Sequence, residues 1–225
     1  MASPPPAGPQ PEPAALPVFD PLEPLNRTIF GFNEACYTVL LRPLAHGYQR
    51  VVPVLVRAGL RNFFNNLKFP VRFAGCVLQG KLARAGREAG RFLVNSTRGF
   101  AGVLRYSEKV PALAGLPAED IGQALGGWGF RPGPYLVLPI FGPSSVRDSL
   151  GFAGEALLDP VGAPATQRTL HGYSMAWRHR VEALEFANSL PGRFRAYDTF
   201  RQSAAEPYAA VRSSYLAYRA AAVKE

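Results

Sequence analysis

This sequence of 225 residues is poor in the residue types that build metal sites and disulfide frameworks. It has two cysteines, Cys36 and Cys76, and three histidines. Two cysteines so far apart are too few for a zinc cluster. They would be able to pair in an oxidising compartment, but two separate buried thiols are the expected state.

Long apolar runs are absent as well. Charges, glycines or prolines interrupt each candidate before it reaches the roughly 18 apolar residues that a spanning helix needs. Yet 48% of the residues are hydrophobic, with 15 Phe and 9 Tyr. That content supports a real core in one domain or a small pair of domains. Contact with a membrane would therefore be lateral or made through an anchor.

Residues 1–24 contain no lysine or arginine and nine of the 22 prolines. They predict an extended tether, and we expect disorder over 1–19. This start also has no charged segment followed by an apolar stretch, so no signal peptide is recognisable. The rest of the chain carries 25 basic against 13 acidic residues. That surplus suits anionic lipid headgroups or nucleic acid, and composition does not separate the two.

The stretch 133–148, GPYLVLPIFGPSSVRD, is strongly apolar and yet carries Pro134, Pro139 and Pro143. Each proline removes a backbone donor and fixes φ, which excludes a helix interior and a central strand. We therefore expect irregular backbone that lies across other elements or lines a cavity.

Four further blocks accompany this stretch in a fixed order, at 20–27 (DPLEPLNR), 30–33 (FGFN), 91–97 (RFLVNST) and 122–129 (GQALGGWG). Together the blocks make the chain resemble the MlaA/VacJ family of bacterial outer-membrane lipoproteins, over roughly residues 20–217. The resemblance implies a helical ring in the inner leaflet of the outer membrane. Such a ring passes phospholipids through a central amphipathic channel toward the periplasm.

The resemblance also implies partners and a location. The partners are phospholipid, the outer membrane, a trimeric porin and a soluble periplasmic lipid carrier, with no nucleic acid. Flow would be retrograde, which preserves lipid asymmetry, although a passive channel does not set direction by itself. Family members are exported with a signal peptide and lipidated on an N-terminal cysteine. Neither feature is in this sequence, so attachment to the periplasmic face of the outer membrane is an expectation.

Hydrophobic periodicity predicts a mainly α-helical protein, because strand-like alternation is scarce. With the resemblance, the expected fold is a ring-like monotopic membrane domain over 20–217, with irregular proline-rich segments and 218–225 as the end of the last helix. Asn26 suits a helix N-cap. Helices are expected at 25–41, from 53 onward, at 71–79, 81–95 and 173–190, and after Pro207.

The helix expected at 81–95 has the clearest charge pattern. At about 100° per residue, Lys81, Arg84, Arg87 and Arg91 share one side, with apolar residues nearly opposite. A basic amphipathic helix lies at an anionic membrane surface or presents a solvated charged face, and the pattern leaves both open.

No catalytic constellation stands out. His171 and His179 lack the four-residue spacing of metal ligands, and Ser144 and Ser145 lie in GPSSV, without the closing glycine of a nucleophile elbow. The glycine-rich block 122–129 has no GKS or GKT ending, and a close backbone packing site beside its tryptophan is expected instead. We expect no enzymatic activity, no metal and no cofactor, with phospholipid as the transported ligand.

Candidate site residues come from the aromatic, proline-rich and arginine-bearing blocks. Candidates for lipid-channel or membrane contact are Phe30, Phe32, Phe63, Phe64, Pro134, Tyr135, Leu138, Pro139, Phe141 and Pro143. Candidates for phosphate contact are Arg27, Arg91, Arg98 and Arg147. A structural role competes at two of these, since Arg147 suits an ion pair with Asp148 and Arg27 suits holding the N-terminal segment.

Two other functions compete with transport. A lipid-anchored scaffold that binds porin would lack a continuous amphipathic passage. A cytosolic basic helical protein that binds nucleic acid would lose affinity steeply with salt. The basic residues are dispersed and no nucleic-acid motif is identifiable, which counts against the latter.

Overall fold

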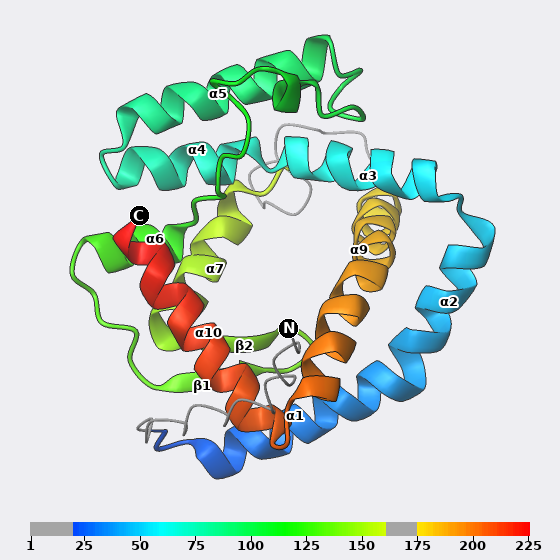
Figure 1. Ribbon diagram of the computed structural model, residues 1–225, viewed down its shortest axis with the longest axis vertical. Coiled ribbons are helices and arrows are strands. Elements are labelled where there is room, and N and C mark those ends of the chain that lie inside the picture. Colours follow the sequence, from blue (N-terminus) through cyan, green and yellow to red (C-terminus); the bar gives the residue numbers. More distant parts are fainter. Residues whose placement is uncertain (1–19, 161–174) are drawn as a thin grey trace, which may run out of the picture.

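The computed structural model describes residues 20–160 and 175–225, whose helices are arranged as a ring (Figure 1). The predicted mainly helical, ring-like architecture is confirmed, whereas the predicted tether at 1–19 lies outside the described residues. The first half of the chain contributes α1 (Glu23–Cys36), η1 (Tyr37–Leu41), α2 (Arg42–Val51), α3 (Val54–Leu67), α4 (Phe69–Leu78), α5 (Leu82–Thr97) and η2 (Tyr106–Lys109). The second half contributes α6 (Ile121–Gly127), β1 (Tyr135–Leu138), β2 (Gly142–Ser145), α7 (Val146–Leu158), α9 (Met175–Ser203) and α10 (Pro207–Lys224).

One side of the ring is a single helical arc made of α1, η1 and α2, drawn in blue in Figure 1. The helix predicted at 25–41 thus continues to Val51. Its middle part, η1, is π-helical, and the Arg42 amide donates to the Tyr37 carbonyl, five residues back. Pro43 accounts for this irregularity, because it has no amide to donate and its ring crowds the preceding turn.

Prolines and a glycine set most of the corners of the ring. Pro53, with φ −58° and ψ 151°, ends the arc and starts α3. Gly80 separates α4 from α5 at φ +71°, a conformation that glycine adopts without strain, and the predicted break there is confirmed. Among the described helices, α1, α4 and α10 carry proline in the first turn, where a missing amide costs no hydrogen bond: Pro24, Pro70 and Pro207.

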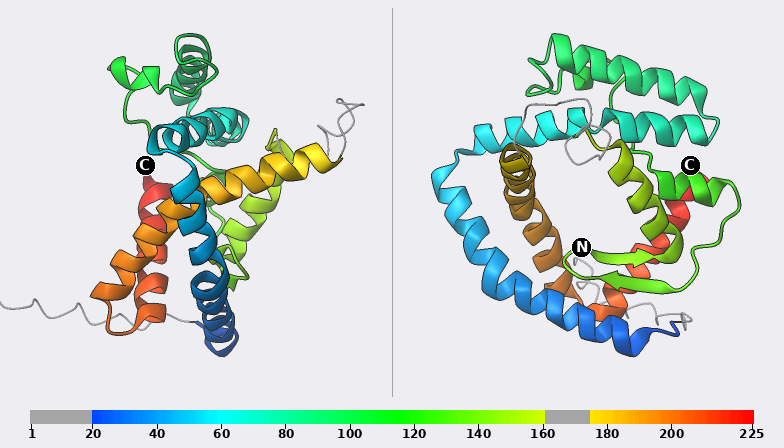
Figure 2. Two further views of the ribbon diagram at one scale, coloured as in Figure 1. Left: turned by 90° about the vertical axis from the view of Figure 1, so that its right-hand side faces the viewer. Right: turned by 180° about the vertical axis from the view of Figure 1, so that it is seen from behind.

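The two C-terminal helices, α9 and α10, complete the ring. The helix α9 packs against α2 and α3, and α10 packs against α6, α9 and β2. Seen edge-on, the N-terminal half of α9 projects out of the ring (Figure 2). The helix predicted at 173–190 is this α9, although residues 173–174 lie outside the described part and the helix runs on through Pro191 to Ser203.

The stretch 133–148 forms a β-hairpin, so the expectation of irregular backbone was wrong here. Strands β1 and β2 pair antiparallel, with Tyr135 opposite Ser145 and Val137 opposite Pro143. The prolines are compatible because the sheet has two strands, and each strand keeps one edge without a partner strand. Pro139 lies in the turn, whose next residue, Ile140, has φ +68°.

The segment 105–119 lies over the basic face of α5, so this face is neither free for a membrane surface nor fully solvated, although Arg87 stays exposed. Glu119 pairs with Lys81 at 3.0 Å and with Arg84 at 2.7 Å. The backbone of the same segment accepts hydrogen bonds from the next two arginines along the helix. The opposite face is the exposed one, with Leu82 69% and Leu93 59% exposed. The helix therefore directs most of its charges toward this segment and exposes these two leucines.

Apolar residues are exposed over much of the ring. Val39 is 77% and Leu55 82% exposed, and along the arc and α3 they are joined by Leu25, Phe32, Leu40, Leu44, Val51, Val54 and Val56. Among the described residues, some of the buried apolar side chains form two small clusters, one centred on Leu190 and Phe194 and the other on Tyr135 and Tyr208. An apolar surface this extensive marks an interaction with a partner or a membrane. Within the described residues, no helix combines the length and apolar content that crossing a bilayer requires.

Candidate functional site

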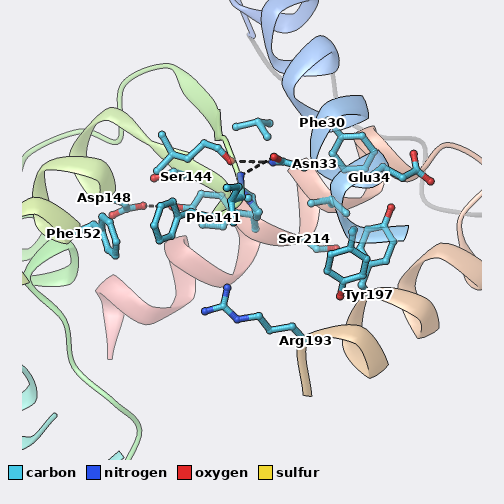
Figure 3. Close-up of a pocket in the computed structure, with 18 of the residues that line it drawn as sticks. Phe30, Asn33, Glu34, Phe141, Ser144, Asp148, Phe152, Arg193, Tyr197 and Ser214 are labelled. Carbon is cyan, nitrogen blue, oxygen red and sulfur yellow. Dashed lines mark hydrogen bonds between the residues drawn. The ribbon is translucent and has the colours of Figure 1, made fainter. Parts of the chain in front are cut away.

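A cavity of about 840 Å³ lies inside the ring (Figure 3). The arc, the hairpin, α7, α9 and α10 all contribute to its wall, together with Asp120, the residue that caps α6. Its apolar lining includes Phe30, Leu41, Val137, Leu138, Ile140, Phe141, Phe152 and Val211. Its polar lining includes Asn33, Glu34, Ser144, Glu155, Arg193, Ser214 and Arg219. The cavity is therefore amphipathic, because side chains of both kinds share one wall.

Two asparagines on α1 hold the hairpin beside the cavity. Asn26 is 1% exposed; its amide nitrogen donates to the Tyr135 carbonyl at 2.9 Å, and its oxygen accepts from the Val137 amide at 2.9 Å. Two helical turns later, Asn33 donates to the Leu138 carbonyl at 2.9 Å and accepts from the Ile140 amide at 2.7 Å. The expectation of Asn26 as an N-cap was wrong, because α1 starts at Glu23 and Asn26 pairs with β1 instead.

The Asn26→Ala variant is expected to lose about 1–3 kcal/mol of unfolding free energy, because the buried partners on β1 become unsatisfied. The matched variant Asn33→Ala is expected to lose less, since the Ile140 amide is at an exposed turn where water replaces the asparagine. Thermal unfolding in mild detergent, followed by circular dichroism, compares the two. Equal losses would contradict the distinction between the buried and the exposed end.

An arginine on α10 neutralises two acids at the base of the cavity. Arg219 pairs with Asp120 at 2.5 Å and with Asp148 at 2.7 Å. Asp148 also accepts from the Tyr215 hydroxyl at 2.6 Å. Burial would raise the pKa of Asp148, but the hydrogen bonds from Arg219 and Tyr215 outweigh burial and lower the pKa to about 2. This network joins α6, α7 and α10 around fixed charges.

Of the helices that carry the Arg219 network, α6 also packs closely against both α7 and α10. A Cβ added to Gly151 on α7 would lie 2.4 Å from the Gly122 nitrogen on α6, and one added to Gly126 would lie 2.6 Å from the Val223 side chain. The backbones approach closely because these residues lack side chains. Close packing was predicted beside the tryptophan of the block 122–129, but the structure places it earlier in the block, at Gly122 and Gly126.

The structure distributes the ten lipid-contact candidates over three environments. Phe30, Leu138, Phe141 and Pro143 line the cavity. Another group lies away from the cavity: Phe32 on α1 is 52% exposed, and Pro134 and Pro139 are exposed at the hairpin. On α3, the ring centre of Phe63 lies 5.4 Å from that of the buried Phe64. Tyr135 is only 2% exposed and lies in the cluster with Tyr208, behind the cavity wall. Four of the ten thus meet in one site.

The arginines proposed for phosphate contact do not line the cavity. Arg91 is buried and pairs with Glu88 at 3.3 Å, and Arg147 is buried and pairs with Asp148 at 2.9 Å, as its structural alternative had it. Arg27 bridges Glu23 and Glu206, so it joins α1 to the start of α10, a structural role other than the one expected of it at the N-terminal segment. Arg98 is exposed and lies 5.7 Å from the Tyr106 ring centre.

Several cavity residues were missed by sequence reasoning. Val211, Tyr215 and Tyr218 on α10 line the cavity together with Ser214, and their helical spacing is the signal that could have grouped them. Phe152 on α7 and Arg193 on α9 belong to no sequence pattern that would have marked them as cavity residues. Their position depends on how helices distant in the sequence meet.

Groups suited to covalent or metal chemistry are scattered. Cys36 and Cys76 are separate thiols. Ser145 caps α7 by accepting from the Asp148 amide, and Ser144 lies 2.9 Å from the Ser149 hydroxyl. His179 lies 3.3 Å from Glu182, and His171 is outside the described residues. In residues 20–160 and 175–225, no three His, Cys, Asp or Glu side chains are placed to hold a metal ion.

Comparison with known proteins finds a matching family and a similar solved structure. The profile of the family described as "MlaA lipoprotein" matches residues 18–222. A solved structure described as "Structural basis for maintenance of bacterial outer membrane lipid asymmetry" superposes with a TM-score of 0.69 and 28% identity, covering 92% of this chain and 100% of that one.

Curated relatives agree with that match. The "Intermembrane phospholipid transport system lipoprotein MlaA" of Shigella flexneri is 34% identical over 61% of this chain and 56% of its own length. An uncharacterized protein of Rickettsia felis is 38% identical over 61% of this chain and 54% of its own length. One from Rickettsia conorii is 31% identical over 92% of this chain and 79% of its own. The chain thus spans about half the length of the first of these curated relatives.

Proposed function

This chain belongs to the MlaA lipoprotein family, and from that premise we propose that it lets phospholipids leave a membrane through the cavity inside its ring. The proposed task is to move a lipid without taking its headgroup through hydrocarbon or its acyl chains through water. Exposing acyl chains is very costly, at about 0.8 kcal/mol per CH₂ group. The observation that carries the proposal is an amphipathic cavity inside a ring whose outside exposes apolar side chains.

We propose that the ring lies within one leaflet of the membrane and does not span the bilayer. The exposed leucines, valines and phenylalanines of the arc and α3 would contact lipid tails, which removes the apolar surface of these side chains from water. In this proposal the cavity opens toward the headgroup side of the same leaflet. We place it at the periplasmic face of the outer membrane, in keeping with the family.

Partners and direction are part of the proposal. A trimeric porin would hold the ring in the outer membrane, and a periplasmic carrier would accept the lipid that leaves it. Retrograde flow, from the outer leaflet toward the inner membrane, would preserve lipid asymmetry. The chain itself offers a passive route, so direction is assigned to the partners and to lipid gradients.

Ser214→Trp tests the passage. Ser214 is exposed in the middle of the cavity wall on α10 (Figure 3), so an indole there would obstruct it. We expect a several-fold loss of phospholipid transfer from vesicles and of phospholipid that co-purifies in mild detergent. Ser214→Ala, which removes the hydroxyl without adding bulk, is expected to keep both. Unchanged transfer in a folded Ser214→Trp protein would contradict transport through the cavity and favour a scaffold.

A further inference from the structure

The cavity contains an arginine whose charge no carboxylate neutralises within the part of the chain that the structure describes. Arg193, on α9, lines the cavity, and Figure 3 shows its guanidinium directed into it. Its guanidinium carbon lies 6.0 Å from the centre of the Phe186 ring. By contrast, Arg219 is paired with two aspartates.

A second donor lies on the same part of the wall. Tyr37 lines the cavity, and its hydroxyl is buried in the wall without a hydrogen-bond partner among the described residues. Its ring centre lies 4.0 Å from that of Phe194, the residue after Arg193. Burial raises the pKa of Tyr37, so the hydroxyl stays protonated and is a donor at neutral pH. Tyr37 also begins the π-helical segment, a backbone irregularity that is frequent at functional sites.

The acids near these two donors are engaged elsewhere. Asp198, on α9, is held by Arg42. Glu155, across the cavity on α7, accepts from the Ile121 amide at 3.2 Å. Glu34, on α1, is directed away from Arg193 in Figure 3. The wall around Arg193 and Tyr37 therefore offers hydrogen-bond donors, one of them cationic, and suits an anionic acceptor.

Resting on the proposed function, we propose that Arg193 and Tyr37 form a subsite for the phosphate group of a phospholipid inside the cavity. The guanidinium donates two hydrogen bonds to phosphate oxygens, and the Tyr37 hydroxyl donates a third. The acyl chains then lie along Phe30, Phe141 and Phe152 on the apolar lining. No bond is made or broken, so the subsite orients the lipid while it passes.

The test compares ligands that share acyl chains but differ in the phosphate. Native mass spectrometry in mild detergent measures binding of phosphatidylglycerol, of diacylglycerol with the same chains, and of inorganic phosphate. We expect the unmodified protein to prefer phosphatidylglycerol over diacylglycerol by about tenfold, the effect of one charge-assisted contact. Arg193→Gln and Tyr37→Phe are expected to reduce that preference while diacylglycerol binding stays unchanged. Arg61→Gln, the same change at an exposed position of α3, is the matched control and should bind as the unmodified protein does.

The outcomes separate the subsite from the transport route. Equal binding of the two lipids, or a preference that survives Arg193→Gln, would overturn the subsite and leave passage through the cavity intact. Binding of inorganic phosphate that Arg193→Gln abolishes, without any preference between the lipids, would identify a free-anion site and overturn the lipid assignment. Binding of neither lipid would overturn the proposed function itself.

Discussion

Glu88→Ala is expected to lower the free energy of unfolding by about 3–5 kcal/mol, the cost of leaving buried charges without their partner. Glu88 is 0% exposed on α5, where it accepts from Arg72 at 2.9 Å and from Arg91 at 3.3 Å. Both guanidinium groups are themselves buried, so water does not reach them when the carboxylate is removed. Denaturant unfolding in mild detergent, followed by circular dichroism, measures the loss.

Glu108→Ala is the matched control for this variant. Glu108 pairs with Arg105 at 2.6 Å, but the two side chains are 35% and 47% exposed. An exposed pair contributes little, so we expect a loss below about 1 kcal/mol. Similar losses for the two variants would mean that burial does not set the strength of these pairs, which would contradict the account of how α5 is held.

The reversed face of α5 shows what periodicity does and does not determine. The spacing of Lys81, Arg84, Arg87 and Arg91 predicted one charged side, and the helix has it. Periodicity does not say what covers each side. Here the segment 105–119 folds back over the charges, with Glu119 lying more than 30 residues away from its partners along the chain. The leucines are then left on the outside.

The hairpin was missed for a different reason. The proline rule excludes a central strand, and that exclusion was correct, but a two-stranded hairpin has no central strand. Its turn is also held by contacts that are not local, since Asn33 binds Leu138 and Ile140 from more than 100 residues away. The cavity lining was not predictable for the same reason. Arg193 and Phe152 line the cavity only because tertiary packing brings α9 and α7 together around it.

Arg219→Gln is expected to cost about 3–5 kcal/mol at neutral pH, because Asp120 and Asp148 lose their shared counter-charge. The cost should depend on pH. In the unmodified protein the pKa of Asp148 is lowered from 3.8 to about 2, so its carboxylate stabilises the fold above about pH 4 and loses that effect as pH falls toward 2. Without Arg219, Asp148 keeps Arg147 and the Tyr215 hydroxyl but loses its strongest partner, so burial counts for more, its pKa rises, and the folded variant takes up the proton at a higher pH than the unmodified protein does. The loss of stability in Arg219→Gln should therefore be largest at pH 7 and shrink as pH falls toward 4.

Unfolding free energies of both proteins at pH 7, 5 and 4, in the same detergent, test this dependence. Arg27→Gln is the control, since Arg27 pairs with Glu23 and Glu206 at the exposed surface and its side chain is 45% exposed. Its cost should stay below about 1 kcal/mol and change little over this range, because water already solvates both acids. A cost for Arg219→Gln that is the same at all three pH values would mean that Asp148 is not the group left uncompensated. The stability of the cavity base would then come from the glycine-mediated packing of α6 on α7, and not from the charges that Arg219 joins.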